Sequence, residues 1–144
     1  MSLASGAMNF SVRPATAADE ELLLDWANDP VVRRNSIASD RISLATHRQW
    51  FRSRLADEEC RIFIAETDPD MAIGQVRFDR KGDGWEVDYS LDRAFRGTGL
   101  GRKLLKCAIQ RLFAEKPGSR IAARVKSANM ASCKVFDGLG FEGR

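Results

Sequence analysis

The chain has 144 residues, 44% of them hydrophobic, which suits one compact α/β domain with a real core and excludes global disorder. Its 23 Lys and Arg against 20 Asp and Glu give a net charge of +3, too small to indicate a nucleic-acid partner. The three cysteines match no zinc or disulfide spacing and no apolar run has the length of a membrane span, so we expect reduced thiols, a cytoplasmic location, no metal and no membrane association.

The beginning of the chain differs in character from the rest of it. Residues 1–8 are small and polar, and we interpret them as an expression scar or a disordered start rather than a signal peptide. A single domain is expected over residues 9–144. Its first strand is predicted from Asn9 to Arg13, where Pro14 ends it.

Two helices are predicted next. Thr16 and Asp19 have the spacing of a capping box, which begins a helix that Asn28-Asp29-Pro30 ends. Residues 31–41 are polar and are expected to be irregular. Ser43 is predicted to cap a second helix, whose apolar face consists of Leu44, Phe51 and Leu55.

Three strands come after these helices, at residues 61–66, 71–78 and 85–91. Gly74 indicates a bulge in the second of them, and the Lys-Gly-Asp-Gly stretch at 81–84 predicts a hairpin turn before the third. Alternation places one set of the third strand's side chains on one face, namely Val87, Tyr89 and Leu91. The opposite face carries Glu86, Asp88 and Ser90.

The last part of the chain is predicted to form a helix, a strand and a helix. The first helix extends from Leu100 to Ala114, with a buried stripe formed by Leu100, Leu104, Ala108 and Leu112. A strand is predicted at 121–125, and a final helix at 129–139 with Gly140 as its C-cap. The resulting order is β-α-α-β-β-β-α-β-α, and the strand-helix-strand unit predicts a parallel or locally mixed sheet.

The most informative segment joins a strand to a helix: Arg96-Gly97-Thr98-Gly99-Leu100-Gly101-Arg102. Glycines allow a sharp turn and close approach of a ligand, the first helical N–H groups favour an anion, and the two arginines add charged donors. This pattern predicts a phosphate or pyrophosphate site, although a tight turn without a ligand stays open. The dinucleotide fingerprint fails because Arg102 occupies its third glycine position, and a P-loop fails because Gly101 precedes Arg102-Lys103.

The same segment resembles the acetyl-CoA pyrophosphate loop of the GNAT superfamily of N-acetyltransferases. A second block, Asn129-x-x-Ser132-x-x-Val135-Phe136-x-x-Leu139-Gly140-Phe141, is similar to the last helix of that family. The resemblance implies an α/β GNAT fold, in which helices flank a central mixed, mostly antiparallel sheet, here without the final strand. It also implies acetyl-CoA as co-substrate and direct attack by an amine on the thioester.

The resemblance assigns residues to the chemistry of both substrates. The implied acetyl-CoA contacts are Tyr89, Ser90, Leu91, Arg96, Gly97, Thr98, Gly99, Leu100, Gly101, Arg102, Asn129 and Ser132. Since an amine must lose a proton, Glu86 is the first candidate for the general base and Asp88 the second. The alternative for either carboxylate is a solvated strand face.

Two departures from the family pattern bear on mechanism. Phe136 stands where many members have a tyrosine that protonates the departing thiolate, and the only tyrosine is Tyr89. Two alternatives therefore stay open: water protonates the departing thiolate, or CoA leaves as a thiolate without being protonated. The chain also stops at Arg144, which implies either a shortened chain or a strand supplied by another chain.

The acceptor is indicated by the segment from Leu24 to Ser36, with Ile42-Ser43 and His47-x-x-Trp50-Phe51 after it. It resembles bacterial acetyltransferases of nucleotide-linked amino sugars, notably of the pseudaminic acid pathway. The implied contacts are Arg33, with Arg34, to a diphosphate, Asn35 and Ser36 to hydroxyls, and His47 as an orienting group or base. Solvated arginines and a structural histidine are the alternatives.

We therefore predict acetyl transfer from acetyl-CoA to a primary amine of a small molecule by a monomer or homodimer. The resemblance indicates a nucleotide-linked amino sugar as the acceptor. Two other interpretations stay open: acetylation of a protein N-terminus, as in ribosomal-protein acetyltransferases, and a non-catalytic acyl-CoA-binding module.

Overall fold

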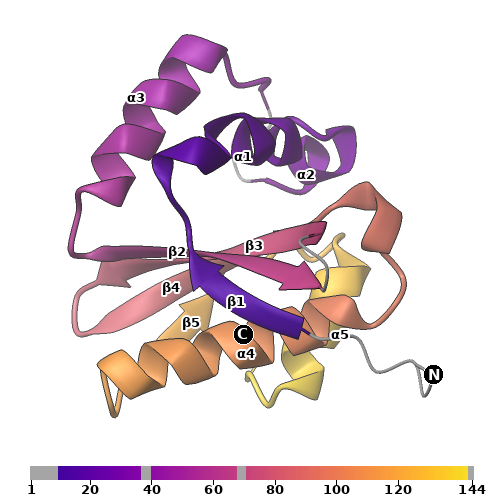
Figure 1. Cartoon of the computed structure of the whole chain (residues 1–144). Coiled ribbons are helices and arrows are strands. Elements are labelled where there is room, and N and C mark those ends of the chain that lie inside the picture. The colour runs from indigo at the N-terminus through magenta and orange to yellow at the C-terminus, as the bar shows by residue number, and fades with distance from the viewer. Residues whose placement is uncertain (1–9, 37–39, 68–70, 143–144) are drawn as a thin grey trace, which may run out of the picture.

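The computed structural model describes residues 10–36, 40–67 and 71–142. The predictions for residues 1–8 and for the chain end at Arg144 lie outside these ranges. A five-stranded sheet in the order β1-β2-β3-β4-β5 forms the centre of the molecule (Figure 1). The strands are β1 Phe10–Pro14, β2 Cys60–Thr67, β3 Met71–Lys81, β4 Gly84–Leu91 and β5 Ile121–Ala123.

The sheet is mixed, as predicted. Strands β1 to β4 pair antiparallel in chain order, and β4 pairs parallel with β5 after the helical crossover. The hairpin between β3 and β4 closes at Lys81 and Gly84. Strand β5 is shorter than predicted and ends at Ala123 rather than Val125, because its pairing with β4 stops at Val87.

Helices cover both faces of this sheet (Figure 1). One face carries α1 Glu20–Ala27, α2 Pro30–Asn35 and α3 Leu44–Leu55, and the other carries α4 Leu100–Glu115 and α5 Met130–Gly138. The four residues of the predicted α4 stripe are all buried, namely Leu100, Leu104, Ala108 and Leu112. They pack on Phe63, Val76 and Phe78 of the sheet, which confirms the periodicity argument.

The face under α1 and α3 has a smaller core. Phe51 is fully buried there with Leu23, Trp26 and Ile64. The prediction that Leu44 and Leu55 share this buried face is wrong: they are 47% and 37% exposed. His47 occupies the buried position instead, one helical turn before Phe51, because these two positions face α1.

The segment predicted to be irregular contains a short helix. Asp29 accepts a hydrogen bond from the backbone N–H of Val31 at 2.9 Å, and Pro30 occupies the first helical position. An acidic N-cap followed by Pro is a helix start, so Asp29-Pro30 begins α2 in addition to closing the segment after α1.

Other boundaries differ from the prediction, since Pro14 still pairs within β1, β3 continues to Lys81, and a 3-10 turn at Ala17–Asp19 precedes α1. The predicted caps and the predicted bulge are confirmed. Asp19 accepts from the backbone N–H of Thr16 at 2.8 Å, and Ser43 caps α3 by accepting from Thr46 at 3.1 Å. The pairing of β2 and β3 shifts register beside Gly74. Gly140 lies after α5 with a φ of 90°. No described helix is long and apolar enough to cross a membrane.

Candidate functional site

The strands β4 and β5 separate before β4 ends, and we call the opening between them the split. Their pairing stops at Val87 and Ala123, whereas β4 continues to Leu91 and pairs with β3 up to that residue. Residues 88–91 therefore have a strand on one side and, within the described chain, none on the other. Such an edge is able to hydrogen-bond an extended ligand as an added strand would.

The glycine-rich turn lies directly after this free edge. Gly97 and Gly99 have φ values of 75° and 80°, in the left-handed region that favours glycine. Gly99 is the N-cap of α4, and no side chain caps this helix end. The first N–H groups of α4 thus remain to receive an anion, as a diphosphate requires.

The two arginines of the turn are engaged with the protein. The Arg96 guanidinium lies 3.0 Å from a carboxylate oxygen of Asp29 and donates to the Leu91 carbonyl at 3.4 Å. Arg102 donates to the carbonyl of Gly138 at the end of α5. A ligand at the turn would therefore meet the backbone N–H groups of the turn rather than these two guanidinium groups.

Strand β4 and the last helix, α5, meet beside the free edge. The Tyr89 hydroxyl of β4 hydrogen-bonds the Ser132 hydroxyl of α5 at 3.0 Å, and Asn129 caps α5 by accepting from Ser132. Burial raises the pKa of Tyr89. Phe136 is buried and packs edge-on against the Tyr89 ring, with 5.6 Å between ring centroids.

The opposite face of β4 carries the carboxylates predicted as bases. Asp88 is exposed, lies 3.8 Å from Arg77, and is the first residue after the pairing with β5 ends. Glu86 lies two residues earlier, where β5 still pairs, and its side chain has no partner among the described residues. Ser90 accepts from Gln75 at 3.1 Å.

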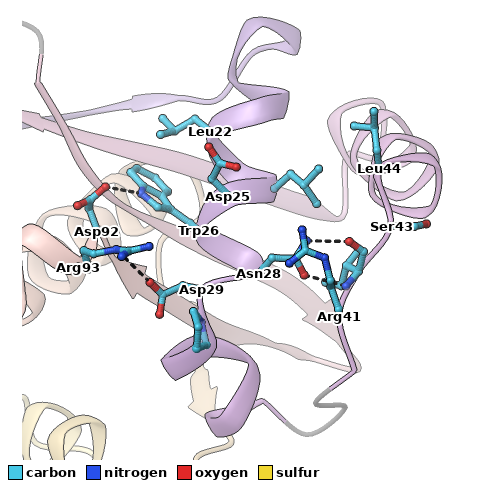
Figure 2. A pocket seen from close by; sticks show the side chains of 13 residues that line it. Leu22, Asp25, Trp26, Asn28, Asp29, Arg41, Ser43, Leu44, Asp92 and Arg93 are labelled. Atoms are coloured by element: carbon cyan, nitrogen blue, oxygen red, sulfur yellow. Dashed lines mark hydrogen bonds and ion pairs between the residues drawn. The ribbon is translucent and has the colours of Figure 1, made fainter.

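A groove with a volume of about 700 Å³ opens beside the end of β4 (Figure 2). Its walls come from α1, from the residues that lead into the start of α2, from the chain before and at the start of α3, and from the residues directly after β4. The charged side chains in its lining are Asp25, Asp29, Arg41, Asp92 and Arg93.

Hydrogen bonds hold the walls of this groove together (Figure 2). Asn28 donates to the Ile42 carbonyl and accepts from the Ile42 N–H, both at 2.7 Å. The Trp26 indole N–H donates to Asp92 at 2.9 Å and holds the pKa of that carboxyl below its usual value. Hydrogen bonds between segments far apart in the sequence therefore fix the shape of the groove.

The residues predicted to meet the acceptor lie elsewhere or are already engaged. Arg33 donates to the carbonyls of Ala27 and Asp40 and to the Ser36 hydroxyl, so it ties α2 to its neighbours. Asn35 is the last residue of α2 and is half-buried. His47 is buried between α1 and α3 and does not line the groove.

The charged groove residues were missed because nothing in their spacing links them. Asp92 and Trp26 are 66 positions apart, and only the fold brings them together. Asp29 did carry a signal, since an acidic residue before Pro marks a helix start whose side chain is held in place.

Known proteins are similar to this chain in sequence. The sequence model of the acetyltransferase (GNAT) domain matches residues 9–142. The L-methionine sulfoximine/L-methionine sulfone acetyltransferase of Pseudomonas aeruginosa is 31% identical, covering 94% of this chain and 81% of that protein. An uncharacterized prophage-derived N-acetyltransferase of Bacillus subtilis is 22% identical over 92% of this chain and 76% of that protein.

Solved structures agree with the fold. The aminoglycoside acetyltransferase AAC(6′)-Ib in complex with coenzyme A superposes with a TM-score of 0.78 at 25% identity, covering 94% of this chain and 86% of that one. The spermidine N-acetyltransferase of Vibrio cholerae gives a TM-score of 0.86 at 16% identity, covering 94% and 82%. With its predicted α/β fold, glycine turn and split sheet in place, the chain belongs to the GNAT acetyltransferase family and is an acetyl-CoA-dependent N-acetyltransferase.

Proposed function

We propose that this enzyme acetylates the primary amine of a small substrate bound in the groove beside the end of β4. The observation that supports this proposal most is the position of the split: the free edge of β4, the glycine turn and the groove adjoin one another. A diphosphate on the turn would leave the pantetheine arm along residues 88–91. The thioester would then lie within the molecule's central layer, next to the acceptor groove.

The reaction needs one nucleophile and one proton acceptor. The uncharged amine nitrogen forms a bond to the thioester carbonyl carbon, the carbon–sulfur bond breaks, and the amine proton passes to a base. Asp88 is our first choice for that base, because it stands where β4 and β5 part, and Glu86 is the second. The backbone N–H groups on the open side of β4, those of Tyr89 and Leu91, would polarise the thioester carbonyl in this proposal, since those of the alternate residues face β3.

The proton for the departing thiolate has two candidate sources. Phe136 has no proton to give, and the Tyr89 hydroxyl is bonded to Ser132. We keep the prediction that water supplies the proton or that CoA leaves as a thiolate. The proposed contacts of Asn129 and Ser132 with acetyl-CoA are supported by their position at the α5 end of the same gap.

The groove favours a small acceptor that carries both charges. Its lining includes the carboxylate of Asp25 and the guanidinium groups of Arg41 and Arg93. A carboxylate can receive an ammonium group, and a guanidinium can receive a carboxylate or phosphate. A nucleotide-linked amino sugar and an amino-acid sulfoximine, the class named for the Pseudomonas aeruginosa relative, both meet this description.

Location, assembly and partners belong to the same proposal. All three cysteines are free thiols, which supports a reducing, cytoplasmic location. A monomer or homodimer is proposed, with no nucleic acid, membrane or metal taking part. A protein N-terminus as the acceptor, and a non-catalytic acyl-CoA-binding module that would bind CoA without turnover, are the alternative proposals.

The acetyl-CoA site is tested by a matched pair of glycine variants. Gly99 and Gly118 have φ values of 80° and 77°, and an added Cβ would meet nothing within 4 Å at either position. Alanine therefore introduces similar backbone strain at both, but only Gly99→Ala places a methyl group where the diphosphate would lie. We expect Gly99→Ala to raise the CoA Kd about tenfold, or about 1.4 kcal/mol, in calorimetric titration. Gly118→Ala should bind as wild type, and equal affinities for both variants would contradict the site.

The acceptor is tested by thiol release from acetyl-CoA. The panel contains amino-sugar nucleotides, L-methionine sulfoximine, L-methionine sulfone, spermidine, an aminoglycoside and a peptide with a free N-terminus. We expect turnover with a small acceptor and none with the peptide. Preference for the peptide would overturn the proposal, and CoA binding without turnover on any amine would favour the non-catalytic module.

A further inference from the structure

Asp29 stands at the junction of the acceptor groove and the glycine turn. It is 8% exposed, it is the N-cap of α2, and it forms part of the groove wall. One carboxylate oxygen accepts from the Val31 N–H at 2.9 Å and lies 3.0 Å from Arg96. The other lies 3.7 Å from Arg93 (Figure 2). A buried carboxylate with this many donors is held in one position.

Arg96 connects that carboxylate to the strand and the turn. Its guanidinium also donates to the carbonyl of Leu91, the last residue of β4. Arg96 is itself the first residue of the glycine turn. The arginine side chain is 30% exposed and is directed at α2 rather than along the turn. The position of the turn is thereby fixed against two elements at once.

We infer that Asp29 is a positioning residue for acetyl-CoA, which acts through Arg96 to hold the glycine turn in the shape that presents its N–H groups to the diphosphate. Arg96 then serves as an anchor of the turn and not as a direct phosphate ligand. This inference rests on the proposed acetyl-CoA site and adds to it a residue 67 positions away from Arg96 in the chain.

The charge of Asp29 and its capping role are separable. Asparagine is as good an N-cap as aspartate, so Asp29→Asn keeps an acceptor for the Val31 N–H and nearly the same volume. It removes the negative charge that Arg96 and Arg93 meet. A purely structural role in α2 would therefore survive this substitution, whereas positioning of Arg96 would not.

The sign of the effect also distinguishes positioning from simple electrostatics. A carboxylate near an anion repels it, so that removal of the charge would tighten CoA binding if Asp29 acted only through its field. Positioning through Arg96 predicts the opposite, namely weaker binding on removal of the charge.

The experiment is a double-mutant cycle on the full chain with coenzyme A as the probe. Asp29→Asn, Arg96→Ala and the double variant are compared by calorimetric Kd and by thermal unfolding, and Asp83→Asn serves as control. Asp83 pairs with Arg120 at 3.2 Å on an exposed turn away from the groove. We expect each single variant to raise the CoA Kd at least about fivefold, and the double variant to be no weaker than Arg96→Ala alone. In turnover, Asp29→Asn should raise the KM for acetyl-CoA more than it lowers kcat.

The outcomes separate this inference from the proposed function. An unchanged or lower Kd for Asp29→Asn, or effects that multiply fully in the double variant, would overturn the role of Asp29. If Gly99→Ala also leaves the CoA Kd unchanged, the proposed site itself fails. If Gly99→Ala weakens binding and Asp29→Asn does not, only the positioning role is lost.

Discussion

The two carboxylates of β4 lie two positions apart and share a face, but their surroundings in the sheet differ. Asp88 comes after the last pair between β4 and β5, whereas Glu86 lies where both strands still pair. Asp88 also lies two residues closer than Glu86 to the end of β4, where the proposed acceptor groove opens. The family resemblance named Glu86 first, and the sequence contains no information on where the two parallel strands part.

This difference leads to a prediction for two conservative variants. Asp88→Asn should lower kcat by about 100-fold or more, the usual contribution of a general base, with little change in the CoA Kd. Glu86→Gln should leave both kcat and the CoA Kd close to their wild-type values. The pH dependence of kcat/KM provides the second readout, since a lost base removes the acidic limb of the profile. A large loss for Glu86→Gln with normal turnover for Asp88→Asn would reverse the assignment.

Other residues show which functional side chains a sequence reveals. The glycine turn was predictable because a backbone position with a positive φ favours glycine, which is visible in the sequence. Gly97 and Gly99 both have a positive φ. The partners of Arg96 were not predictable, because an arginine beside a glycine turn is equally consistent with a phosphate donor and with an anchor. Only the fold shows that Asp29 lies 3.0 Å away.

Strands β3 and β4 approach each other closely at Gly74. A Cβ at this position would lie 2.5 Å from the Ser90 carbonyl oxygen and 3.3 Å from the Leu104 side chain. Since backbone cannot yield as a side chain does, Gly74→Ala should destabilise the protein by about 1–3 kcal/mol in urea unfolding. Gly138→Ala is the control, because its nearest neighbour is the movable Arg102 guanidinium at 3.1 Å, and it should change stability by less than about 0.5 kcal/mol. Equal effects would show that Gly74 tolerates a methyl group.

Among the elements, those with a strong local pattern were predicted best. The α4 stripe repeats at helical spacing over four buried residues, so its existence and its inward face were both predictable. Helix α2 was missed because Asn28-Asp29-Pro30 marks a helix end and a helix start at the same place. The inward face of α3 was misjudged because Leu44 faces the groove, where tertiary contacts and not periodicity decide burial.

At the scale of the whole molecule, the burial of His47 between helices makes the stability of the fold depend on pH. It is the only histidine, it is 3% exposed, and its Nε2 has no hydrogen-bond partner in the described structure. Burial lowers the pKa of His47 below its usual value of 6.5, so the unfolded chain binds its proton more tightly than the folded one. The contribution of His47 to the free energy of unfolding should therefore be fully present above pH 6.5 and decline as pH falls below it.

Denaturant titrations between about pH 7.5 and about pH 5 measure this effect before carboxylates with usual pKa values begin to matter. His47→Gln should flatten the dependence in that range, because it removes the titrating ring while retaining a polar group of similar length. An equal slope in the variant would show that other groups cause it.

The order of strands and helices was predictable because each element carries its own pattern, and the crossover rule then required parallel pairing at β4. The groove was not, since its walls are distant in sequence. Most of its lining nevertheless belongs to one stretch, residues 22–44, while the glycine turn belongs to another, residues 96–102. Recombining the first stretch with that of a relative should retarget the enzyme to another amine, provided that an acidic residue remains at position 29 to meet Arg96.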